Sequence, residues 1–414
     1  MRADAQRLPA PGELVELTVG EPAHGGWCVA RPDQRPGPVI FVRHALPGER
    51  VRAVITQTTS KLARADAVEI LTAAAGRVRP PCPQARPGGC GGCDWQHASL
   101  PAQRELKAAV ISGQLRRIAG IDRPVTVEPV PGDENGLGWR TSVRFAVRAD
   151  GVAGLRAHRS HEVIDTGGCP IAHPLIGAAQ VTSQRWPGPG SVQVRVAPES
   201  GDRTVLAAGR AEGPRHLRQR AAGRQWRVSA ASFWQVHPGA ASLLAAAVLD
   251  ALAPRPGDRV LDLYCGAGLF AGVLGSAVGP AGQVTGLERD RAAVRDARRN
   301  LRAMPWARVR QGDAAALLAR HGLAGASLAV LDPPRTGAAR PVVSALCGPP
   351  GPGGQGLRRI AYVSCDPATL ARDLALLAEG GWQLHALRAF DAFPMTHHVE
   401  CLAVLTRPGR AAAG

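Results

Sequence analysis

The sequence contains very little lysine and no long uninterrupted hydrophobic run. Lys61 and Lys107 are the only lysines among 50 basic residues, so arginine carries nearly all of the positive charge. The most apolar stretch, residues 243–252, is too short for a membrane span of about 20 residues and is interrupted by Asp250. Residues 1–7 lack the apolar core of a signal peptide. We therefore expect a cytoplasmic protein that does not enter membranes.

The composition that is present indicates a multidomain globular protein. The chain has 414 residues, of which 45% are hydrophobic, enough for several domains with cores of their own. Its net charge of +17 fits a nucleic-acid partner. Arginine-rich coding bias, visible in the abundant alanine, glycine and proline, explains the charge equally well. The nine cysteines are an odd number, typical of a reducing compartment in which cysteine binds metal or acts in catalysis.

Three regions differ in their pattern along the chain. Residues 12–71 read as short apolar segments broken by glycine and proline, which predicts a small β-barrel. A cysteine-bearing loop follows over residues 76–92, then a helix over 101–118 and a mixed α+β stretch without an assigned topology. From residue 228, apolar strands alternate with helices, which predicts a doubly wound, largely parallel sheet. We expect its last two strands, 383–389 and 400–406, to form an antiparallel edge.

A glycine-rich turn lies where the first strand of this α/β region runs into a helix. Gly266 and Gly268 would let a ligand approach the backbone there, and Glu288 ends the next strand, where a carboxylate can accept ribose hydroxyls. The same spacing also satisfies a dinucleotide-binding pattern, so NAD stays an alternative at this point. A tight structural turn without a ligand is the other alternative.

Three further residues lie at strand ends predicted to meet the same crevice. Asp332 ends the fourth strand, directly before two prolines and Arg335. Cys365 follows the fifth strand and precedes a helix, a position that favours the thiolate and suits a nucleophile. Glu400 opens the final strand and is a candidate general base, although an ordinary edge-strand carboxylate is the more common explanation for a residue in this position. The neighbouring histidines, 397 and 398, are expected on opposite sides of that strand.

A second constellation consists of cysteines in a glycine- and proline-rich loop. Cys82, Cys90 and Cys93 fall within twelve residues, and Cys169 is a distant fourth. Four thiolates suit an iron–sulfur cluster or structural zinc. A zinc ribbon would need a second close pair, whereas Cys169 is alone, which favours the cluster.

With these residues identified, the sequence resembles the RNA uracil-5-methyltransferase family, whose members make 5-methyluridine in tRNA or 23S rRNA. Residues 1–72 resemble its OB-like, RNA-binding TRAM domain, residues 73–227 its central domain with the cysteine loop, and residues 228–408 its Rossmann-like S-adenosylmethionine-dependent methyltransferase domain. The motifs occur in the family's order along nearly the whole chain.

The resemblance also implies roles for individual residues. Cys365 would be the nucleophile that adds to uracil C6, and Glu400 the base that removes the C5 proton. The S-adenosylmethionine and uracil side would involve the following residues: Gln235, Tyr264, Gly266, Gly268, Glu288 and Asp332. The ligands of a [4Fe–4S] cluster would be Cys82, Cys90, Cys93 and Cys169. The partner would be RNA, and we expect a monomer.

The sequence departs from the family pattern near these motifs, at Leu269 of the cofactor turn, in a longer gap between Cys82 and Cys90, and at two further residues. His237 stands where the family usually has asparagine, and Asp366 replaces the common asparagine after the nucleophile. A carboxylate beside Cys365 opposes thiolate formation unless it points away. The alternatives to an RNA methyltransferase are a non-catalytic RNA-binding protein and an NAD(P)-dependent iron–sulfur oxidoreductase. The first leaves Cys365 and Glu400 without a role.

Overall fold

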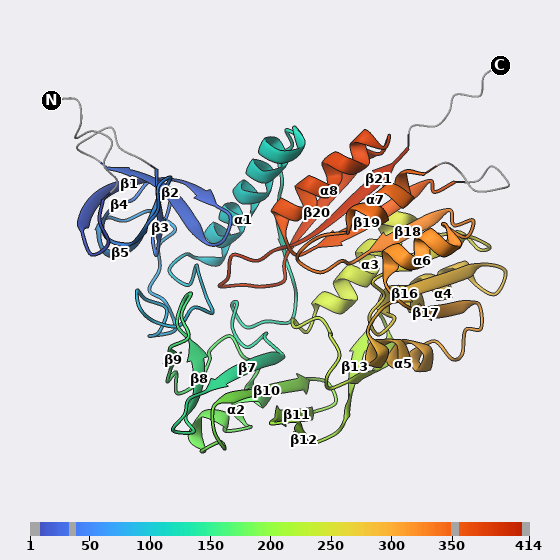
Figure 1. Ribbon diagram of the computed structural model, residues 1–414, viewed down its shortest axis with the longest axis horizontal. Coiled ribbons are helices and arrows are strands. Elements are labelled where there is room, and N and C mark those ends of the chain that lie inside the picture. Colours follow the sequence, from blue (N-terminus) through green and yellow to red (C-terminus); the bar gives the residue numbers. More distant parts are fainter. Residues whose placement is uncertain (1–8, 33–38, 349–355, 408–414) are drawn as a thin grey trace.

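The computed structural model describes residues 9–32, 39–348 and 356–407. A β-barrel lies at one end of the molecule and an α/β domain at the other, with a second sheet between and below them (Figure 1). The domain ranges predicted above also include residues 1–8, 33–38, 349–355 and 408, which lie outside the described residues.

The barrel is closed, as the alternating pattern predicts. Its five strands are β1 (Leu14–Ala23), β2 (Trp27–Pro32), β3 (Ile40–Arg43), β4 (Arg50–Thr58) and β5 (Ala63–Thr72). They follow one another around the barrel in the order β1, β2, β3, β5, β4. Every second side chain points inward, so small and branched residues such as Leu17, Ile40 and Val51 fill the interior completely.

A helix then connects the barrel to the α/β domain. It comprises α1 (Leu100–Gln114) and a short π-helical turn, η2 (Leu115–Ala119). The Ser99 side chain caps the start of α1 by accepting a hydrogen bond from the Ala102 N–H. The fully buried Lys107 donates to Asp391 at 2.5 Å and to the Phe393 carbonyl at 3.0 Å. This buried ion pair holds α1 against the end of the last long hairpin of the chain.

The central region contains a six-stranded sheet and a separate hairpin. The sheet order is β12, β11, β10, β7, β8, β9, and the hairpin joins β13 to β14. The bounds are β7 (Ser142–Val147), β8 (Ala153–Arg156), β9 (Val163–Ile164), β10 (Gly190–Ala197), β11 (Asp202–Ala207), β12 (Arg210–Glu212), β13 (His216–Ala221) and β14 (Arg224–Ser229). Two short helical turns, α2 (Pro174–Gly177) and η3 (Val181–Ser183), precede β10.

The α/β domain is a doubly wound sheet, as predicted. Its strands are β15 (Arg259–Leu263), β16 (Gln283–Glu288), β17 (Ala307–Gln311), β18 (Leu328–Leu331), β19 (Arg359–Ser364), β20 (Gln383–Asp391) and β21 (Glu400–Thr406). Its helices are α3 (Ala240–Leu252), α4 (Leu269–Val278), α5 (Arg291–Asn300), α6 (Ala314–His321), α7 (Arg340–Cys347) and α8 (Pro367–Glu379). The strands lie in the order β17, β16, β15, β18, β19, β21, β20, β6. From β15 the chain first adds strands on one side, β16 and β17, and then crosses to the other side of β15 with β18. Ligands of such sheets bind at the carboxyl ends of the strands near the point of this crossing.

The edge of this sheet differs from the expectation. β21 inserts antiparallel between β19 and β20, so it is an interior strand. β20 pairs in parallel with β6 (Val127–Pro129), which arrives from the central region and covers the edge. The predicted antiparallel hairpin is present, but the edge assignment is wrong because a distant three-residue strand occupies that place.

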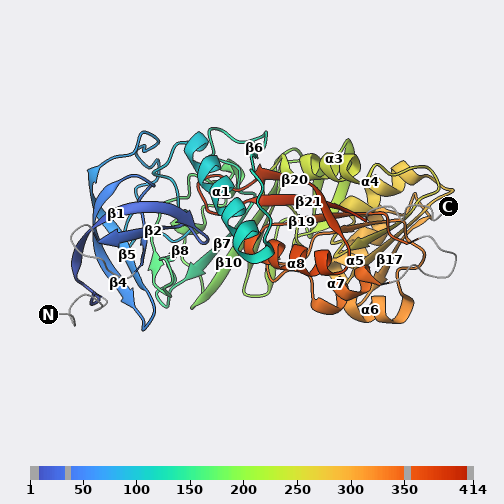
Figure 2. The same cartoon turned by 90° about the horizontal axis from the view of Figure 1, so that it is seen from above.

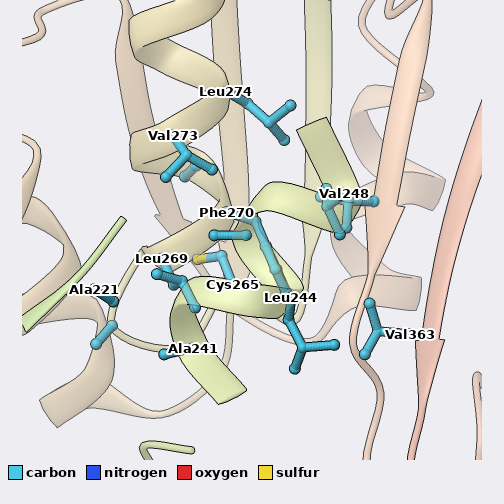
Figure 3. Packing of buried hydrophobic residues seen from close by; sticks show 14 of the residues in the cluster. Ala221, Ala241, Leu244, Val248, Cys265, Leu269, Phe270, Val273, Leu274 and Val363 are labelled. Atoms are coloured by element: carbon cyan, nitrogen blue, oxygen red, sulfur yellow. The ribbon is translucent and has the colours of Figure 1, made fainter. Parts of the chain in front are cut away.

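Two apolar cores lie on the two faces of the sheet, and the strands alternate between them. Along β19, Ala361 and Val363 face one core while Ile360 and Tyr362 face the other. Helices α3 and α4 cover the first face, and α6, α7 and α8 cover the second (Figure 2). Figure 3 shows the first core, where Leu244 of α3 and Phe270 of α4 lie close together near the sheet. This packing fixes the strand ends that carry the polar residues.

Candidate active site

The glycine-rich turn after β15 is bent by residues in the left-handed region. Tyr264 has a φ of 68° and Gly266 a φ of 52°. The Tyr264 and Cys265 N–H groups both donate to the Leu287 carbonyl, at 2.9 and 3.1 Å, which ties the turn to the end of β16. A side chain built on Gly266 would meet nothing within 4 Å. The Gly266 backbone therefore faces open space beside the strand ends, as a ligand-binding turn requires.

Gly268 has a different local role. It caps α4 with a φ of 90°, and an added Cβ would approach the Ala297 Cβ at 3.2 Å. The absent side chain thus permits α4 to pack closely on α5. The predicted cofactor contact of Gly268 stays a prediction, because its backbone conformation and packing already explain the glycine.

Carboxylates gather at the ends of β15, β16 and β18. The buried Asp262 accepts a hydrogen bond from the Ala271 N–H through Oδ2 at 2.7 Å, whereas its buried Oδ1 has no partner among the described residues. Burial, together with the neighbouring charges of Asp332 and Glu288, raises the pKa of Asp262 to about 8. Glu288 accepts from the Gly266 N–H at 2.9 Å and from the Asp290 N–H at 2.8 Å. Asp262 Oδ1 is an acceptor without a partner among the described residues, and open space adjoins Gly266. Together they suit a ligand that carries hydroxyl groups or positive charge.

Cys365 and Glu400 are brought together by the pairing of β19 with β21. Ser364 of β19 lies opposite Cys401 of β21, so the next residues along the two strands, Cys365 and Glu400, stand side by side at the strand ends. Glu400 is 3% exposed. Burial and the nearby Asp332 raise the pKa of Glu400 well above its usual value, and Arg335 lowers it. The sequence-predicted pair therefore occupies one buried, electrostatically coupled site with Asp332.

The expected stabilisation of a Cys365 thiolate by the helix terminus is wrong for the free protein. Burial raises the pKa of the Cys365 thiol to about 12, and Glu400 acts in the same direction. Asp366 caps α8 by accepting hydrogen bonds from the Ala368 and Thr369 N–H groups at 3.0 and 2.8 Å. The helix therefore directs its free N–H groups at a carboxylate instead of at the sulfur.

Arg335 is a further functional candidate; the family resemblance places the motif from Asp332 to Arg335 on the cofactor and uracil side but predicts no separate role for the arginine. It is the one cation that lowers the pKa values of both Cys365 and Glu400 in the described structure. Its Nη2 lies 3.3 Å from His398 Nε2. The sequence does contain a feature that points to Arg335. An arginine follows the two prolines after Asp332, and this segment leaves the carboxyl end of β18 beside the predicted crevice.

The neighbouring histidines do not lie on opposite sides of a strand. They precede β21 in a bend, and their ring centroids are 4.0 Å apart. His397 Nδ1 lies 2.6 Å from Asp94 Oδ2, and the His397 N–H donates to the same oxygen at 3.1 Å. The expectation failed because strand alternation does not apply to a bend.

Gln235 lies in the loop between β14 and α3 and is 8% exposed. His237, the departure noted two residues later, holds this loop by three contacts. Its Nδ1 accepts from the Gly239 N–H at 3.2 Å, its Nε2 lies 3.5 Å from Asp133 Oδ2, and its ring stacks on Trp139 with centroids 6.0 Å apart. The histidine therefore provides a fixed loop despite the changed residue type.

The four loop cysteines line a single cavity. The lining thiols are Cys82, Cys90, Cys93 and Cys169, and Arg140 and Gln96 lie beside them. All four are free cysteines. Within the described ranges, no group of three or more His, Cys, Asp or Glu residues could hold a metal ion. The structure thus brings the predicted ligands together without forming a compact site for one ion.

Taken together, the doubly wound sheet, the open glycine turn and the acidic strand ends define an α/β methyltransferase with an additional β-barrel. A model of the tRNA (Uracil-5-)-methyltransferase family matches residues 325–408, and a TRAM domain model matches residues 10–68. A model of the protein-L-isoaspartate(D-aspartate) O-methyltransferase family matches residues 225–316, which include the glycine turn.

Full-length relatives agree with these matches. An uncharacterized RNA methyltransferase of Streptomyces avermitilis is 47% identical, and the alignment covers 95% of this chain and 98% of the relative. The 23S rRNA (uracil(1939)-C(5))-methyltransferase RlmD of Alkalilimnicola ehrlichii is 32% identical over 97% of this chain and 98% of that protein. This chain belongs to the RNA (uracil-5-)-methyltransferase family, whose members use S-adenosylmethionine.

A solved structure has the same fold along the chain. The Pyrococcus abyssi tRNA (uracil-54, C5)-methyltransferase, in complex with S-adenosyl-L-homocysteine, superposes with a TM-score of 0.68 at 22% identity, over 94% of this chain and 99% of that one. In the part of the chain that the structure describes, no helix is long and apolar enough to cross a membrane.

Proposed function

We propose that this chain methylates C5 of a uridine in structured RNA through a covalent bond between Cys365 and C6 of the base. The β19–β21 pairing carries the proposal, since it sets Cys365 beside Glu400 within reach of the charges of Asp332 and Arg335. A nucleophile and a base at one buried point are what substitution at an electron-poor ring carbon needs.

The proposed steps use these residues in turn. The Cys365 thiol gives its proton to water, and its sulfur bonds to C6, which shifts the electron pair of the C5–C6 double bond toward C5. C5 uses this electron pair to bond to the methyl group of the donor, whose carbon–sulfur bond breaks so that S-adenosylhomocysteine leaves. The Glu400 carboxylate takes the proton from C5, the C6–sulfur bond breaks, and the double bond forms again with Cys365 released. Burial and Asp332 raise the pKa of Glu400, so its carboxylate, once ionised, holds the transferred C5 proton firmly.

The glycine turn and the acidic strand ends fit the methyl donor. S-Adenosylmethionine supplies the methyl group from a positively charged sulfonium. We assign its contacts to Tyr264, Gly266, Glu288 and Asp332, with Gln235 positioned on the side of the base. The unpaired Asp262 Oδ1 and the open space at Gly266 support this assignment.

The RNA substrate is 23S rRNA or tRNA in this proposal. The purified protein is incubated with labelled S-adenosylmethionine and either RNA lacking 5-methyluridine, and nucleosides are resolved by mass spectrometry. We expect label in 5-methyluridine from one RNA pool only. Label in another nucleoside, or no transfer although S-adenosylhomocysteine binds, would contradict the assignment to uridine C5.

The barrel contributes a cluster of cations suited to RNA phosphates. The guanidinium groups of Arg43, Arg64 and Arg159 lie 5.8, 5.5 and 5.7 Å from the centroid of the Trp27 ring. Arg159 comes from the turn between β8 and β9, so the cluster spans the barrel and the central region. Burial is the main cause that lowers the pKa values of Arg43 and Arg64, and the charge of Arg159 acts in the same direction. We propose that Arg64 and Arg159 of this cluster, together with His158 against Trp27, contact the RNA backbone, while the buried Arg43 supports them from below the surface.

Replacing Arg64 or Arg159 by glutamine is expected to weaken RNA binding without changing base preference. Each lost contact to a single-stranded phosphate should lower the slope of log Kd against log salt by about 0.7. Fluorescence anisotropy with labelled RNA at several salt concentrations measures this slope. Arg116→Gln is the matched control, because Arg116 is exposed on η2 and pairs only with the exposed Asp122 at 3.7 Å. Unchanged slopes in both cluster variants would refute the contact.

We further propose that the four loop cysteines hold a [4Fe–4S] cluster. A cluster separates its ligands by its own width, so its thiolates can line a cavity without lying within reach of one ion. The cavity shared by Cys82, Cys90, Cys93 and Cys169 supports this reading over a single zinc ion.

Anaerobically purified protein is expected to contain about four iron and four sulfide per chain. Cys90→Ser should lose most of this iron, whereas Cys347→Ser, which alters a cysteine at the end of α7, should retain it. Iron and sulfide analysis with an absorption spectrum decides the question. Zinc in place of iron, or no metal at all, would overturn the proposal.

We assign the chain to the cytoplasm as a monomer, with boundaries at residues 72/73 and 227/228. The end of β5 at Thr72 supports the first boundary, whereas the second falls inside the hairpin strand β14, Arg224–Ser229. Sedimentation of the purified protein tests the oligomeric state.

A further inference from the structure

The barrel touches the nucleophile loop through the tip of its first hairpin. His24 lies in the three-residue turn between β1 and β2, and its Nε2 is 3.2 Å from Asp366 Oδ2. Asp366 directly follows Cys365. A residue of the N-terminal barrel and a residue next to the nucleophile are thus paired, although most of the chain separates them in sequence.

The two carboxylate oxygens of Asp366 have separate partners. Oδ1 accepts from the Ala368 and Thr369 N–H groups and so caps α8. Oδ2 faces His24 and the barrel. An asparagine could cap α8 equally well through its single oxygen. Compared with asparagine, aspartate adds a second carboxylate oxygen and a negative charge at this position. His24 contacts this second oxygen, Oδ2.

The hairpin tip itself is firmly seated. Gly25 and Gly26 both have φ values in the left-handed region, at 90° and 80°. A Cβ on Gly26 would meet the Asp94 side chain at 2.6 Å, so the turn packs directly on that residue. Asp94 in turn binds His397, whose ring meets His24 edge-on with centroids 6.1 Å apart. The tip therefore presents His24 to Asp366 in a defined position.

Charges around Cys365 show why this pairing has consequences. Glu400 of β21, Asp332 after β18 and Asp366 all oppose its ionisation, and Arg335 favours it. Burial is the largest obstacle and is fixed by the fold. Of the three carboxylates, Glu400 and Asp332 belong to the reaction site itself, so Asp366 is the one whose charge a neighbouring residue can offset without altering the chemistry.

We propose that His24 is a positioning residue, which holds the Asp366 carboxylate toward the barrel and α8 and offsets its charge beside the Cys365 sulfur. Docking of the barrel is thereby coupled to activation of the nucleophile. The inference rests on the proposed role of Cys365 and goes beyond it, since it gives the barrel a part in the chemistry in addition to RNA binding.

A double-mutant cycle with His24→Ala and Asp366→Asn tests the coupling. The rate of Cys365 alkylation by iodoacetamide at fixed pH is measured in the full-length protein by peptide mass spectrometry. Alkylation of Cys347 in the same sample serves as the internal reference. The thiolate is the reacting form, so the rate reports its population. If His24→Ala changes the access of iodoacetamide to the sulfur, it does so equally in the Asp366 protein and in the Asp366→Asn protein. Such a change in alkylation rate therefore cancels in the cycle.

We expect His24→Ala to slow Cys365 alkylation roughly threefold to tenfold in the Asp366 protein, because an uncompensated neighbouring carboxylate disfavours the thiolate. The same change should have no effect in the Asp366→Asn protein. His24→Gln, which retains a donor, should fall between the two. An equal effect of His24→Ala in both backgrounds, or none in either, would overturn the proposal.

The alkylation assay uses neither RNA nor S-adenosylmethionine, so its outcome is independent of the assigned reaction. In methyl-transfer assays, His24→Ala should lower kcat by a similar factor and leave the KM for S-adenosylmethionine unchanged. Loss of alkylation coupling with intact methylation refutes the positioning role. Intact coupling without methylation of any RNA would instead refute the proposed function.

Discussion

Cys365→Ala is expected to abolish formation of 5-methyluridine, with a fall in rate of about 10⁴-fold or more, as for other enzymes that lose a nucleophile. No other described thiol can substitute. Cys401, the nearest in the register, is fully buried within β21. Nucleoside mass spectrometry on the unmethylated RNA measures the product.

Cys347→Ala is the matched control for this variant. Cys347 ends α7, and its pKa is raised by burial as that of Cys365 is, but among the described residues no carboxylate raises it. The rate of methyl transfer by the Cys347→Ala protein should stay within about twofold of the rate of the unmodified protein, because substitutions away from the site have small effects. Residual 5-methyluridine formation at a comparable rate in Cys365→Ala would show that another group adds to the base.

Glu400→Gln is expected to trap the reaction after methyl transfer. The amide cannot accept the C5 proton, so the bond from Cys365 to C6 persists, and turnover falls by about 10²–10⁴-fold. The change also removes a negative charge that raises the pKa of Cys365, which favours the first addition. A protein–RNA complex that survives denaturing electrophoresis should therefore accumulate.

Two comparisons make this second result decisive. The double variant Cys365→Ala/Glu400→Gln should form no such complex. Glu379→Gln, at the exposed end of α8, should turn over normally. Normal turnover of Glu400→Gln would assign the proton to another base, with Asp332 as the nearest carboxylate that is electrostatically linked to it.

Local patterns in the sequence predicted most of the fold. Period-two alternation gave the barrel strands, and apolar runs followed by helical segments gave the doubly wound sheet. β6 was missed because a three-residue strand that pairs with β20 carries no pattern of its own. The pairing with β20 decides where β6 lies. The hairpin of β13 and β14 is likewise placed by a tertiary contact, because it packs Trp226 against the first core.

The candidate site was predictable where function lies at strand ends. The positions of Asp332 and Cys365 followed from the rule that ligands bind at the carboxyl ends of parallel strands. Glu400 opens the antiparallel β21, and its role was predicted through the family resemblance. The ionisation state of Cys365 did not follow, because it depends on burial and on carboxylates from other strands. The contact of His24 with Asp366 joins residues that are distant in sequence, and no local signal reports it.

The glycines illustrate the same limit at a finer scale. Gly266 and Gly268 carry the same letter in the same motif, yet one faces open space and the other faces Ala297 of α5. Sequence spacing identifies the turn. Only the packing of α4 on α5 distinguishes a glycine that a ligand can approach from one that a helix requires.

The most direct test of the account is a covalent trap with RNA that carries 5-fluorouridine at the target position. Fluorine at C5 cannot leave as a proton, so the adduct formed after methyl transfer should persist. We predict that digestion of the complex yields a peptide in which Cys365 is joined to a methylated 5-fluorouridine. Methylation of the unmodified RNA without any such peptide, or a crosslink at another residue, would contradict the proposed chemistry.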